Sequence, residues 1–249
     1  MPRSYHIQRR RCTNSACYYL QIVLRGKNLE LAGGHLYRLC GQHLWLMPQK
    51  CIYWQEEQAI LLADLHLGKA GHFRKAGIRI PAQVHRHDLQ ELGRAVLLTG
   101  AERVIVLGDL FHSQHNCEWQ ILEGWLRTYP RLEVQLIMGN HDWYGGAHLP
   151  AAITNCGDKL AAGPFLLTHE PLPEQLLTTD YYNLAGHVHP AVKLNGKGRQ
   201  QLVLPCFLFT PGQGILPAFG KFTGTARTDV HPQDDVFVVA GSKIIPFSA

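Results

Sequence analysis

The sequence lacks the features that mark membrane, repeat and disulfide-rich proteins. No run of about 18 or more apolar residues occurs, so a membrane-spanning helix is not expected. No internal repeat or low-complexity tract is found, and nothing suggests a second domain of comparable size. The seven cysteines are odd in number and scattered, without the spacing of a disulfide framework or a zinc knuckle. They are typical of free thiols in a reducing compartment, so we expect a cytoplasmic protein.

Outside its amino terminus, the 249-residue chain also lacks an excess of one charge. The net charge is +5, but residues 1–30 hold six basic residues and one acidic residue, so the remainder carries 18 of each sign. The overall charge therefore does not indicate a nucleic-acid partner, and only a local basic patch could attract one. We expect residues 1–35 to be a basic extension, either disordered or translated from a mistakenly early start codon. Residues 36–249 are expected to form the domain.

The sequence does contain five short polar blocks. They are Asp64-Leu65-His66, Gly108-Asp109, Gly139-Asn140-His141-Asp142, His169 and Gly186-His187-Val188-His189. Each of the first three follows a run of mostly apolar residues. A buried strand that ends in a polar residue places that side chain at the carboxyl edge of its sheet, where α/β proteins bind ligands. The blocks therefore predict one site assembled from distant parts of the chain.

The blocks offer imidazole, carboxylate and amide donors and no thiolate. The candidate metal ligands are Asp64, His66, Asp109, Asn140, His169, His187 and His189. This set suits Mn²⁺, Fe or Zn²⁺ at an open, reactive centre better than a closed structural site. Seven donors exceed the needs of one catalytic ion but suffice for two divalent ions ~3.5–4 Å apart that share a carboxylate. Glycines before Asp109, Asn140 and His187 allow sharp turns or a close approach of the backbone.

The order of the blocks, D-x-H, G-D, G-N-H-D/E, H and G-H-x-H, resembles that of the calcineurin-like metallophosphoesterases. The surrounding residues 63–69, 72–78, 108–113 and 216–220 are similar to the ligase-associated DNA damage response phosphoesterases, or PdeM family, which are related to SbcD-type repair nucleases. The resemblance extends from about Leu36 to Phe247. It implies an α/β fold with four layers, α/β/β/α, and a phosphoesterase that uses two metal ions, with Mn²⁺ the first candidate.

The resemblance also distributes the ligands between two ions. One ion would be bound by Asp64, His66 and His189, and the other by Asn140, His169 and His187. Asp109 would bridge them, because each of its two oxygens can serve one cation and its charge offsets their repulsion. His187 and His189 lie two residues apart, so in extended structure both would project to one face and reach neighbouring ions.

Further residues are candidates for catalysis and for substrate binding. His141 is expected to stabilise charge on the substrate and protonate the leaving group after attack by a metal-bound hydroxide, and Asp142 to hold the His141 ring in the required tautomer. His112 lies three residues after Asp109 and is a candidate for contact with the substrate. The basic residues Lys69, Arg74 and Lys75 would either contact phosphates or form an ordinary solvated face.

Periodicity and turn residues predict the elements between the blocks. Helices are expected from Pro81 to about Gly100, with Leu89, Leu92 and Val96 as a buried stripe, and from Cys117 to Tyr129 before Pro130. Strands are expected at residues 44–46, 51–54, 60–64, 104–108, 134–138, 165–168, 182–185, 202–208, 236–240 and 243–246, the last two joined by a Gly241-Ser242 turn. Early strands alternate with helices, whereas the later ones follow each other as in an antiparallel sheet.

Three functions are compatible with these residues. The resemblance favours a phosphodiesterase or endonuclease that acts on DNA, with an ATP-dependent DNA ligase as a repair partner. The alternative is a small-molecule phosphoesterase for a cyclic nucleotide or a lipid-linked pyrophosphate, although the lipid hydrolases usually have arginine where this chain has His141. A non-catalytic scaffold usually loses ligands, and none is lost here. A homodimer is compatible with the resemblance, but no coiled-coil heptad indicates one.

Overall fold

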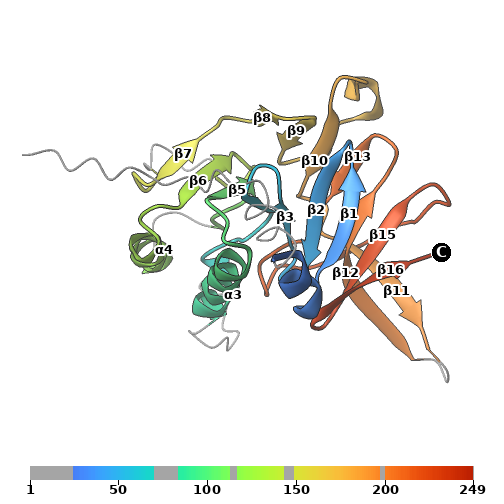
Figure 1. Ribbon diagram of the computed structural model, residues 1–249, viewed down its shortest axis with the longest axis horizontal. Coiled ribbons are helices and arrows are strands. Elements are labelled where there is room, and N and C mark those ends of the chain that lie inside the picture. Colours follow the sequence, from blue (N-terminus) through green and yellow to red (C-terminus); the bar gives the residue numbers. More distant parts are fainter. Residues whose placement is uncertain (1–24, 70–83, 113–116, 143–148, 197–199, 249) are drawn as a thin grey trace, which may run out of the picture.

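The computed structural model describes residues 25–69, 84–112, 117–142, 149–196 and 200–248. Two β-sheets lie face to face, and helices pack on the outside of one of them (Figure 1). Among the described residues, no helix is both long and apolar enough to cross a membrane.

Within the described residues, the first sheet has seven strands in the order β1 to β7. They are β1 (His35–Leu39), β2 (Gln42–Met47), β3 (Cys51–Trp54), β4 (Ala59–Leu62), β5 (Arg103–Leu107), β6 (Glu133–Ile137) and β7 (Ile153–Asn155). Antiparallel pairs join β1 to β4, whereas β4 to β7 pair in parallel. The crossovers after β4 and β5 contain α3 (Val84–Thr99) and α4 (Cys117–Thr128). Parallel pairing brings the carboxyl ends of β4, β5 and β6 to one edge of the sheet.

In the part of the chain that the structure describes, the second sheet has nine strands. Seven of them follow the order β14-β11-β12-β13-β10-β9-β8, with β15 on β12 and β16 on β15. They are β8 (Lys159–Ala162), β9 (Phe165–Thr168), β10 (Tyr182–Ala185), β11 (Pro190–Asn195), β12 (Gln201–Phe209), β13 (Gln213–Ile215), β14 (Ala226–Arg227), β15 (Asp235–Ala240) and β16 (Lys243–Phe247). A 3₁₀ turn, η1 (Glu174–Leu176), precedes β10. The expected antiparallel order is wrong around β10, which pairs in parallel with β9 and β13. The physical reason is that a long connection, rather than a hairpin, returns the chain from β9.

Alternate residues of the first sheet face two different cores. In β4, Ile60 and Leu62 pack into the cluster beneath the helices, whereas Ala59 and Leu61 pack into the cluster between the sheets. The helix side is completed by Leu89, Leu92 and Val96 of α3, which are buried as the periodicity predicts. The expected arrangement of two facing sheets with helices outside is therefore confirmed for the first sheet.

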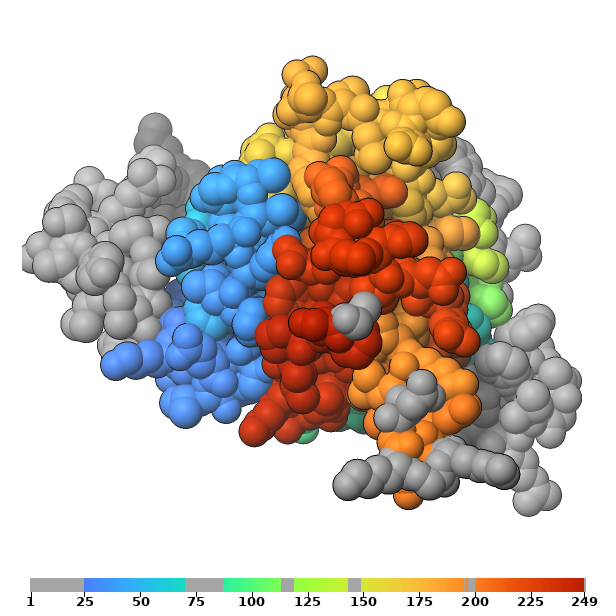
Figure 2. All heavy atoms as spheres, turned by 90° about the vertical axis from the view of Figure 1, so that its right-hand side faces the viewer, coloured from blue at the N-terminus to red at the C-terminus, as the bar shows by residue number. Residues whose placement is uncertain are grey.

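The outer face of the second sheet carries no α-helix within the described ranges. A smaller apolar cluster covers it instead, formed by Val192, Cys206, Leu208, Ile215, Val236 and Val238 with partly buried Val230 and Phe247 against them. Figure 2 shows the side of the molecule where the last strands lie beside the first ones. There, the Tyr37 hydroxyl donates to Asp235 Oδ2 at 2.8 Å. The fold is thus α/β, and the two sheets are joined along this side as well as through their shared core.

Part of the expected amino-terminal extension packs on the domain. Residues 25–31 are helical, Leu29 is fully buried in the helix-side cluster, and Arg25 Nη1 donates to the Tyr53 hydroxyl at 3.0 Å. Residues 1–24 lie outside the described residues, as does the predicted helix start at Pro81. The boundary at residue 36 therefore stays a prediction.

The predicted elements that fall on described residues are found, with small shifts at their ends. Helix α3 ends at Thr99, and Gly100, in the left-handed region at φ 60°, donates its N–H to Val96 O. The Gly241-Ser242 turn joins β15 to β16 as expected. Six strands were not predicted: β1, β7, β8, β11, β13 and β14. Most are short or half exposed, so their sequences carry little apolar periodicity.

Candidate metal centre

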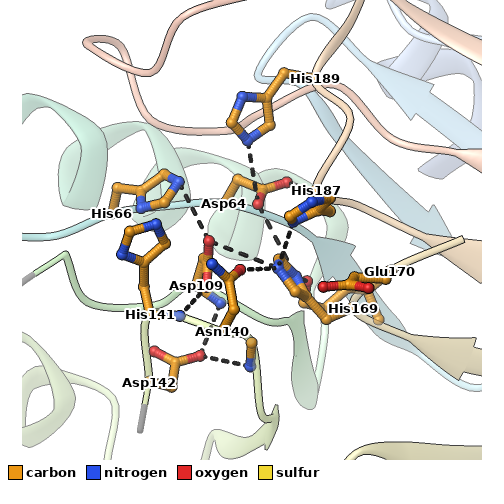
Figure 3. Close-up of polar contacts among 12 residues, drawn as sticks. Asp64, His66, Asp109, Asn140, His141, Asp142, His169, Glu170, His187 and His189 are labelled. Carbon is orange, nitrogen blue, oxygen red and sulfur yellow. Dashed lines mark hydrogen bonds and ion pairs between the residues drawn. The ribbon is translucent and has the colours of Figure 1, made fainter. Parts of the chain in front are cut away.

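The five polar blocks come together where strands of both sheets end (Figure 3). Asp64, Asp109 and Asn140 follow β4, β5 and β6, which are neighbours in the first sheet. The second sheet contributes His169 after β9, and His187 and His189 after β10. The carboxyl ends of parallel strands thus form the floor of the site, as the sequence predicts.

Most of the candidate ligands have a backbone conformation that non-glycine residues rarely adopt. The φ angles are positive at Asp64 (56°), His66 (46°), Asp109 (53°), His187 (64°) and His189 (54°). Each such residue costs of order 1–3 kcal/mol, and this strain concentrates at functional sites. Extended structure for residues 187–189 was therefore a wrong expectation. The left-handed turns redirect side chains that would otherwise continue along the sheet.

The acidic and histidine donors form two groups. Asp64, His66 and His189 have ligand atoms that all lie within 4.8 Å of one another, and so do Asp109, His169 and His187. In the first group, His189 Nε2 lies 3.2 Å from Asp64 Oδ1. The other oxygen of Asp64 accepts the backbone N–H of His187 at 2.9 Å. Asp64 therefore ties the ligand turn of one sheet to that of the other.

Asp109 lies between the two groups. Its Oδ2 atom is 3.5 Å from His66 Nε2 and 3.6 Å from His169 Nε2. Its Oδ1 atom accepts the backbone N–H of His141 at 2.9 Å, which holds the carboxylate in place. The Oδ2 atom therefore faces a histidine of each donor group. The expectation that each oxygen serves one cation stays a prediction.

The second group is organised around the His169 imidazole. His169 Nδ1 donates to the carbonyl oxygen of Leu107 at 3.0 Å, which leaves Nε2 as the ring's lone-pair atom. That Nε2 lies 3.0 Å from Asn140 Oδ1 and 3.1 Å from His187 Nδ1. Three donors on three different loops thus converge on one point. Such convergence is the arrangement that a divalent cation requires.

Several buried atoms in the first group have no hydrogen-bond partner in the described structure. They are Asp64 Oδ1, His66 Nδ1 and His189 Nε2. Burial, reinforced by the charge of Lys69 and by neighbouring histidines, lowers the pKa of His66 to about 2, so its imidazole is neutral and has a lone pair. Burial has the opposite effect on a carboxyl group, and it raises the pKa of Asp109. Asp64 Oδ1 and His189 Nε2 lie 3.2 Å apart. Buried polar atoms without hydrogen bonds are costly, so these two donors fit a bound cation that would satisfy both.

Asp142 has different partners from the expected one. Its carboxylate accepts the backbone N–H groups of Asp109 (2.7 Å), Gly139 (3.0 Å) and Phe111 (3.1 Å). It was expected to orient the His141 ring, but it instead fastens the loop after β5 to the loop after β6 (Figure 3). Burial raises the pKa of Asp142 to about 6. Asp142 therefore supports the two loops that carry Asp109 and Asn140.

Three of the expected catalytic and substrate-binding residues lie at the site. The His141 ring is 5.2 Å from the rings of both His66 and His112, measured between centroids, and the His112 ring is 5.5 Å from that of His66. The ammonium group of Lys69 interacts electrostatically with Asp64 and Asp109, although burial lowers its pKa. Arg74 and Lys75 fall outside the described residues.

Glycines permit the close packing of the ligand loops, as expected. A Cβ at Gly139 would lie 2.3 Å from Asp109 Oδ1, and one at Gly186 would lie 2.7 Å from Asp64 Oδ2. The segment Leu216–Gly220, which the sequence marked only by its resemblance, adds a further support. Gly220 donates its N–H to the carbonyl of Asp64, and a Cβ at Gly220 would lie 2.6 Å from Leu65 O.

We expect Gly108→Ala to destabilise the protein by about 3 kcal/mol or more, because a left-handed φ of 75° is combined with a clash. The added Cβ would lie 2.2 Å from His169 Nδ1. Gly157→Ala is the matched control, since Gly157 has the same φ of 75° and nothing within 4 Å of its Cβ position. It should cost only about 1–2 kcal/mol. Urea unfolding measures the free energy of unfolding of both variants. An equal loss of stability in the two would show that the clash at Gly108 contributes nothing.

A pH-dependent stability is expected from Asp88 in α3. This buried carboxylate accepts the backbone N–H of Lys221, and burial raises its pKa from 3.8 to about 6. Between about pH 4 and pH 6, the folded protein keeps the proton on Asp88, whereas the unfolded chain releases it. The stabilisation that this proton gives to the fold is present below about pH 4 and is lost as the pH rises through about 6. Asp88→Asn cannot ionise and should gain up to about 3 kcal/mol relative to the wild type across this window. Urea unfolding of both metal-free proteins measures the free energy of unfolding at each pH. A constant difference between wild type and Asp88→Asn from pH 4 to pH 6 would contradict this prediction.

The fold resembles that of a solved nuclease structure. The crystal structure of the Pseudomonas putida nuclease MPE superposes with a TM-score of 0.71 at 31% sequence identity, over 86% of this chain and 100% of that one. A phosphoesterase from Escherichia coli, YfcE, is 14% identical over 76% of this chain and 98% of its own, with a TM-score of only 0.39. No protein-family model and no curated protein matches the sequence.

The two facing sheets and the paired groups of donors at their strand ends define a metal-dependent phosphoesterase. The chain belongs to the calcineurin-like metallophosphoesterase superfamily. Within it, the 31% identity over the full length of the Pseudomonas putida nuclease makes that enzyme a close structural relative.

Proposed function

We propose that the protein is a two-metal phosphodiesterase that cleaves DNA, in the manner of the ligase-associated repair phosphoesterases. The observation that carries this proposal is the position of Asp109 Oδ2, about equally far from a histidine nitrogen of each donor group. The similarity to a nuclease across 86% of the chain supports a nucleic-acid substrate. Mn²⁺ is the proposed cation, because the oxygen and imidazole donors suit it, with Fe and Zn²⁺ as alternatives.

When bound, two divalent cations lower the pKa of water toward ~7 and stabilise charge on the phosphoryl oxygens. Asp64, His66 and His189 would hold one cation, Asn140, His169 and His187 the other, and Asp109 both. His141 would donate a proton to the leaving oxygen as the bond from that oxygen to phosphorus breaks. The His141 ring lies 5.2 Å from the His66 ring, and the backbone N–H of His141 bonds Asp109 Oδ1.

The remaining residues at the site would support the ligand loops or bind the substrate. Asp142 would act by holding the loops after β5 and β6 together, rather than by touching the substrate. His112 and Lys69 lie close enough to the donors to contact a phosphate. An ATP-dependent DNA ligase is the proposed partner in repair, and the cytoplasm is the proposed location. Light scattering would measure whether the protein forms a homodimer.

A comparison of substrates tests the proposal. Metal-replete protein would be assayed on an aryl phosphodiester, single-stranded DNA, a cyclic nucleotide and a lipid-linked pyrophosphate. We expect cleavage of the aryl diester and of DNA, both abolished by EDTA and restored by Mn²⁺. Preferential cleavage of the cyclic nucleotide or of the lipid would replace the DNA proposal by the small-molecule alternative, which no contact in the described site favours.

A further inference from the structure

A buried amide in the second sheet lies beside the loop that carries His169. Asn183 is the second residue of β10 and is only 1% exposed, although Leu184 and Ala185 after it are apolar and fully buried. Leu184 packs in the cluster between the sheets. Because successive side chains of a strand point to opposite faces, Asn183 points to the outer face of the second sheet. Its burial therefore comes from chain segments outside the core between the sheets.

Every polar group of the Asn183 side chain bonds the strand or the loop next to His169. Its Nδ2 atom donates to the carbonyl of Leu166 at 2.8 Å and to Thr168 Oγ1 at 2.9 Å. Its Oδ1 atom accepts the backbone N–H of Leu172 at 3.2 Å. Because His169 lies between residues 168 and 172, one side chain of β10 holds the chain on both sides of this candidate ligand.

Thr168 extends the network across His169. Its side chain is buried, and its Oγ1 atom donates to the carbonyl of Glu170 at 2.7 Å while it accepts a hydrogen bond from Asn183. The carbonyl of His169 itself accepts the backbone N–H of Gly186 at 2.9 Å. The backbone is thus fixed before, at and after the ligand position.

This backbone support sets where the His169 ring meets the other donors (Figure 3). The ring is anchored to the first sheet through Nδ1, which donates to Leu107 O. Its Nε2 atom lies 3.0 Å from Asn140 Oδ1 and 3.1 Å from His187 Nδ1. Metal sites tolerate changes in ligand distance of only about 0.2 Å, so a small shift of the loop would separate Nε2 from these partners.

The packing of the sheet does not by itself require an amide at position 183. A buried polar group without partners is costly, whereas an apolar side chain of the same shape in place of a hydrogen-bonded one is often nearly neutral for stability. What an apolar residue at this position would lose is the hold on the chain at Thr168 and Leu172. The first donor group is held differently, because the Asp64 turn is fastened by the backbone N–H groups of Gly220 and His187.

We propose that Asn183 and Thr168 are positioning residues for the cation that Asn140, His169 and His187 would hold. They act through His169, whose loop they fix so that Nε2 meets the ligand atoms of the other two residues. The inference rests on the proposed two-metal function. It adds to that function a pair of residues that set the affinity for one ion and leave the affinity for the other unchanged.

The test is a calorimetric titration of the metal-free protein with Mn²⁺, in which the wild type should bind two ions. Asn183→Leu replaces the amide by an apolar side chain of similar size. It should weaken one of the two ions by about 10- to 100-fold, as the loss of residues that orient metal ligands commonly does, and leave the other within about twofold.

Two backgrounds assign the weakened ion. His66→Ala removes a ligand of the first donor group, so the ion that still binds is held by the second group. There, Asn183→Leu should weaken the remaining ion. His187→Ala removes a ligand of the second group, and in that background Asn183→Leu should leave the affinity of the remaining ion unchanged.

Substitutions of Thr168 test the same link with a smaller change of volume. Thr168→Val keeps the shape but removes the hydroxyl that contacts Glu170 and Asn183, so it should weaken the same ion by about tenfold. Thr168→Ser keeps the hydroxyl and should restore the affinity to nearly the wild-type value. Thr168→Val decides the outcome if Asn183→Leu does not fold.

Thr99→Val is the matched control for a general effect on stability. The Thr99 hydroxyl is also buried, donates to the carbonyl of Ala95 at 2.7 Å and accepts the N–H of Ala101 at 3.2 Å. Thr99 lies before β5, whereas the candidate ligand Asp109 follows that strand. In urea unfolding, Thr99→Val should lose stability as Thr168→Val does, but its affinities for both ions should stay at the wild-type values.

The inference is disproved if Asn183→Leu and Thr168→Val bind both ions as the wild type does, or if they weaken the two ions equally. An affinity in Thr168→Ser as low as that in Thr168→Val would contradict the role of the hydroxyl. A wild-type protein that binds fewer than two Mn²⁺ ions would instead overturn the proposed function.

Discussion

Asp109→Asn is expected to lower hydrolysis of an aryl phosphodiester by about 10³-fold or more and to reduce the bound metal below two ions per chain. The Oδ2 atom of Asp109 lies between His66 Nε2 and His169 Nε2, at 3.5 and 3.6 Å. A neutral amide has the same shape but cannot offset the repulsion between two cations. Metal content by mass spectrometry, measured beside kcat/KM, separates the loss of an ion from the loss of chemistry.

The amide keeps an oxygen that can accept the His141 N–H, so the fold should survive the Asp109→Asn substitution. Circular dichroism and urea unfolding check this. Asp180→Asn is the matched control, because Asp180 is an exposed carboxylate outside the five blocks, and it should change neither activity nor metal content. Two bound ions together with full activity in Asp109→Asn would remove the basis of the proposed function.

His141→Asn should lower kcat by about 10²- to 10⁴-fold while both metal ions stay bound. The substitution keeps the backbone N–H that contacts Asp109 Oδ1 and removes only the ring that lies 5.2 Å from His66. Because the ring is proposed to protonate the leaving oxygen, the loss should be greater for an alkyl leaving group than for p-nitrophenolate, which needs no proton.

A control substitution tests whether the removal of any histidine would lower activity in the same way. His231→Asn changes an exposed histidine of the chain segment before β15 and should leave both leaving groups unaffected. Equal losses for the two leaving groups in His141→Asn would contradict the role as acid. Loss of an ion from this variant would instead assign His141 to metal binding.

The strands and helices nearest the site were predictable because their sequences are strongly periodic. β4 and β5 place alternate residues in two cores, so their apolar runs are uninterrupted until the ligand that follows them. α3 shows its stripe at Leu89, Leu92 and Val96 and its end at Gly100. By contrast, β13 and β14 have three and two residues, too few for a pattern to emerge.

The candidate ligands were predictable for a similar reason. A polar residue at the end of an apolar run is visible in the sequence, and the parallel pairing of β4, β5 and β6 brings three such ends together. The partners of Asp142 were not predictable in this way. Its carboxylate accepts N–H groups from residues 31 and 33 positions earlier in the chain, and proximity in sequence had suggested His141 instead.

The amino-acid sequence by itself determined the donor types, their order and the strand ends that carry them, because these follow from local patterns of apolar and polar residues. Only the tertiary structure decided that Asp109 faces both donor groups with one oxygen, that five candidate ligands adopt left-handed turns, and that Asn183 bonds the chain on both sides of His169. The physical reason is that these features depend on hydrogen bonds and steric contacts between segments far apart in the chain, which no local pattern records.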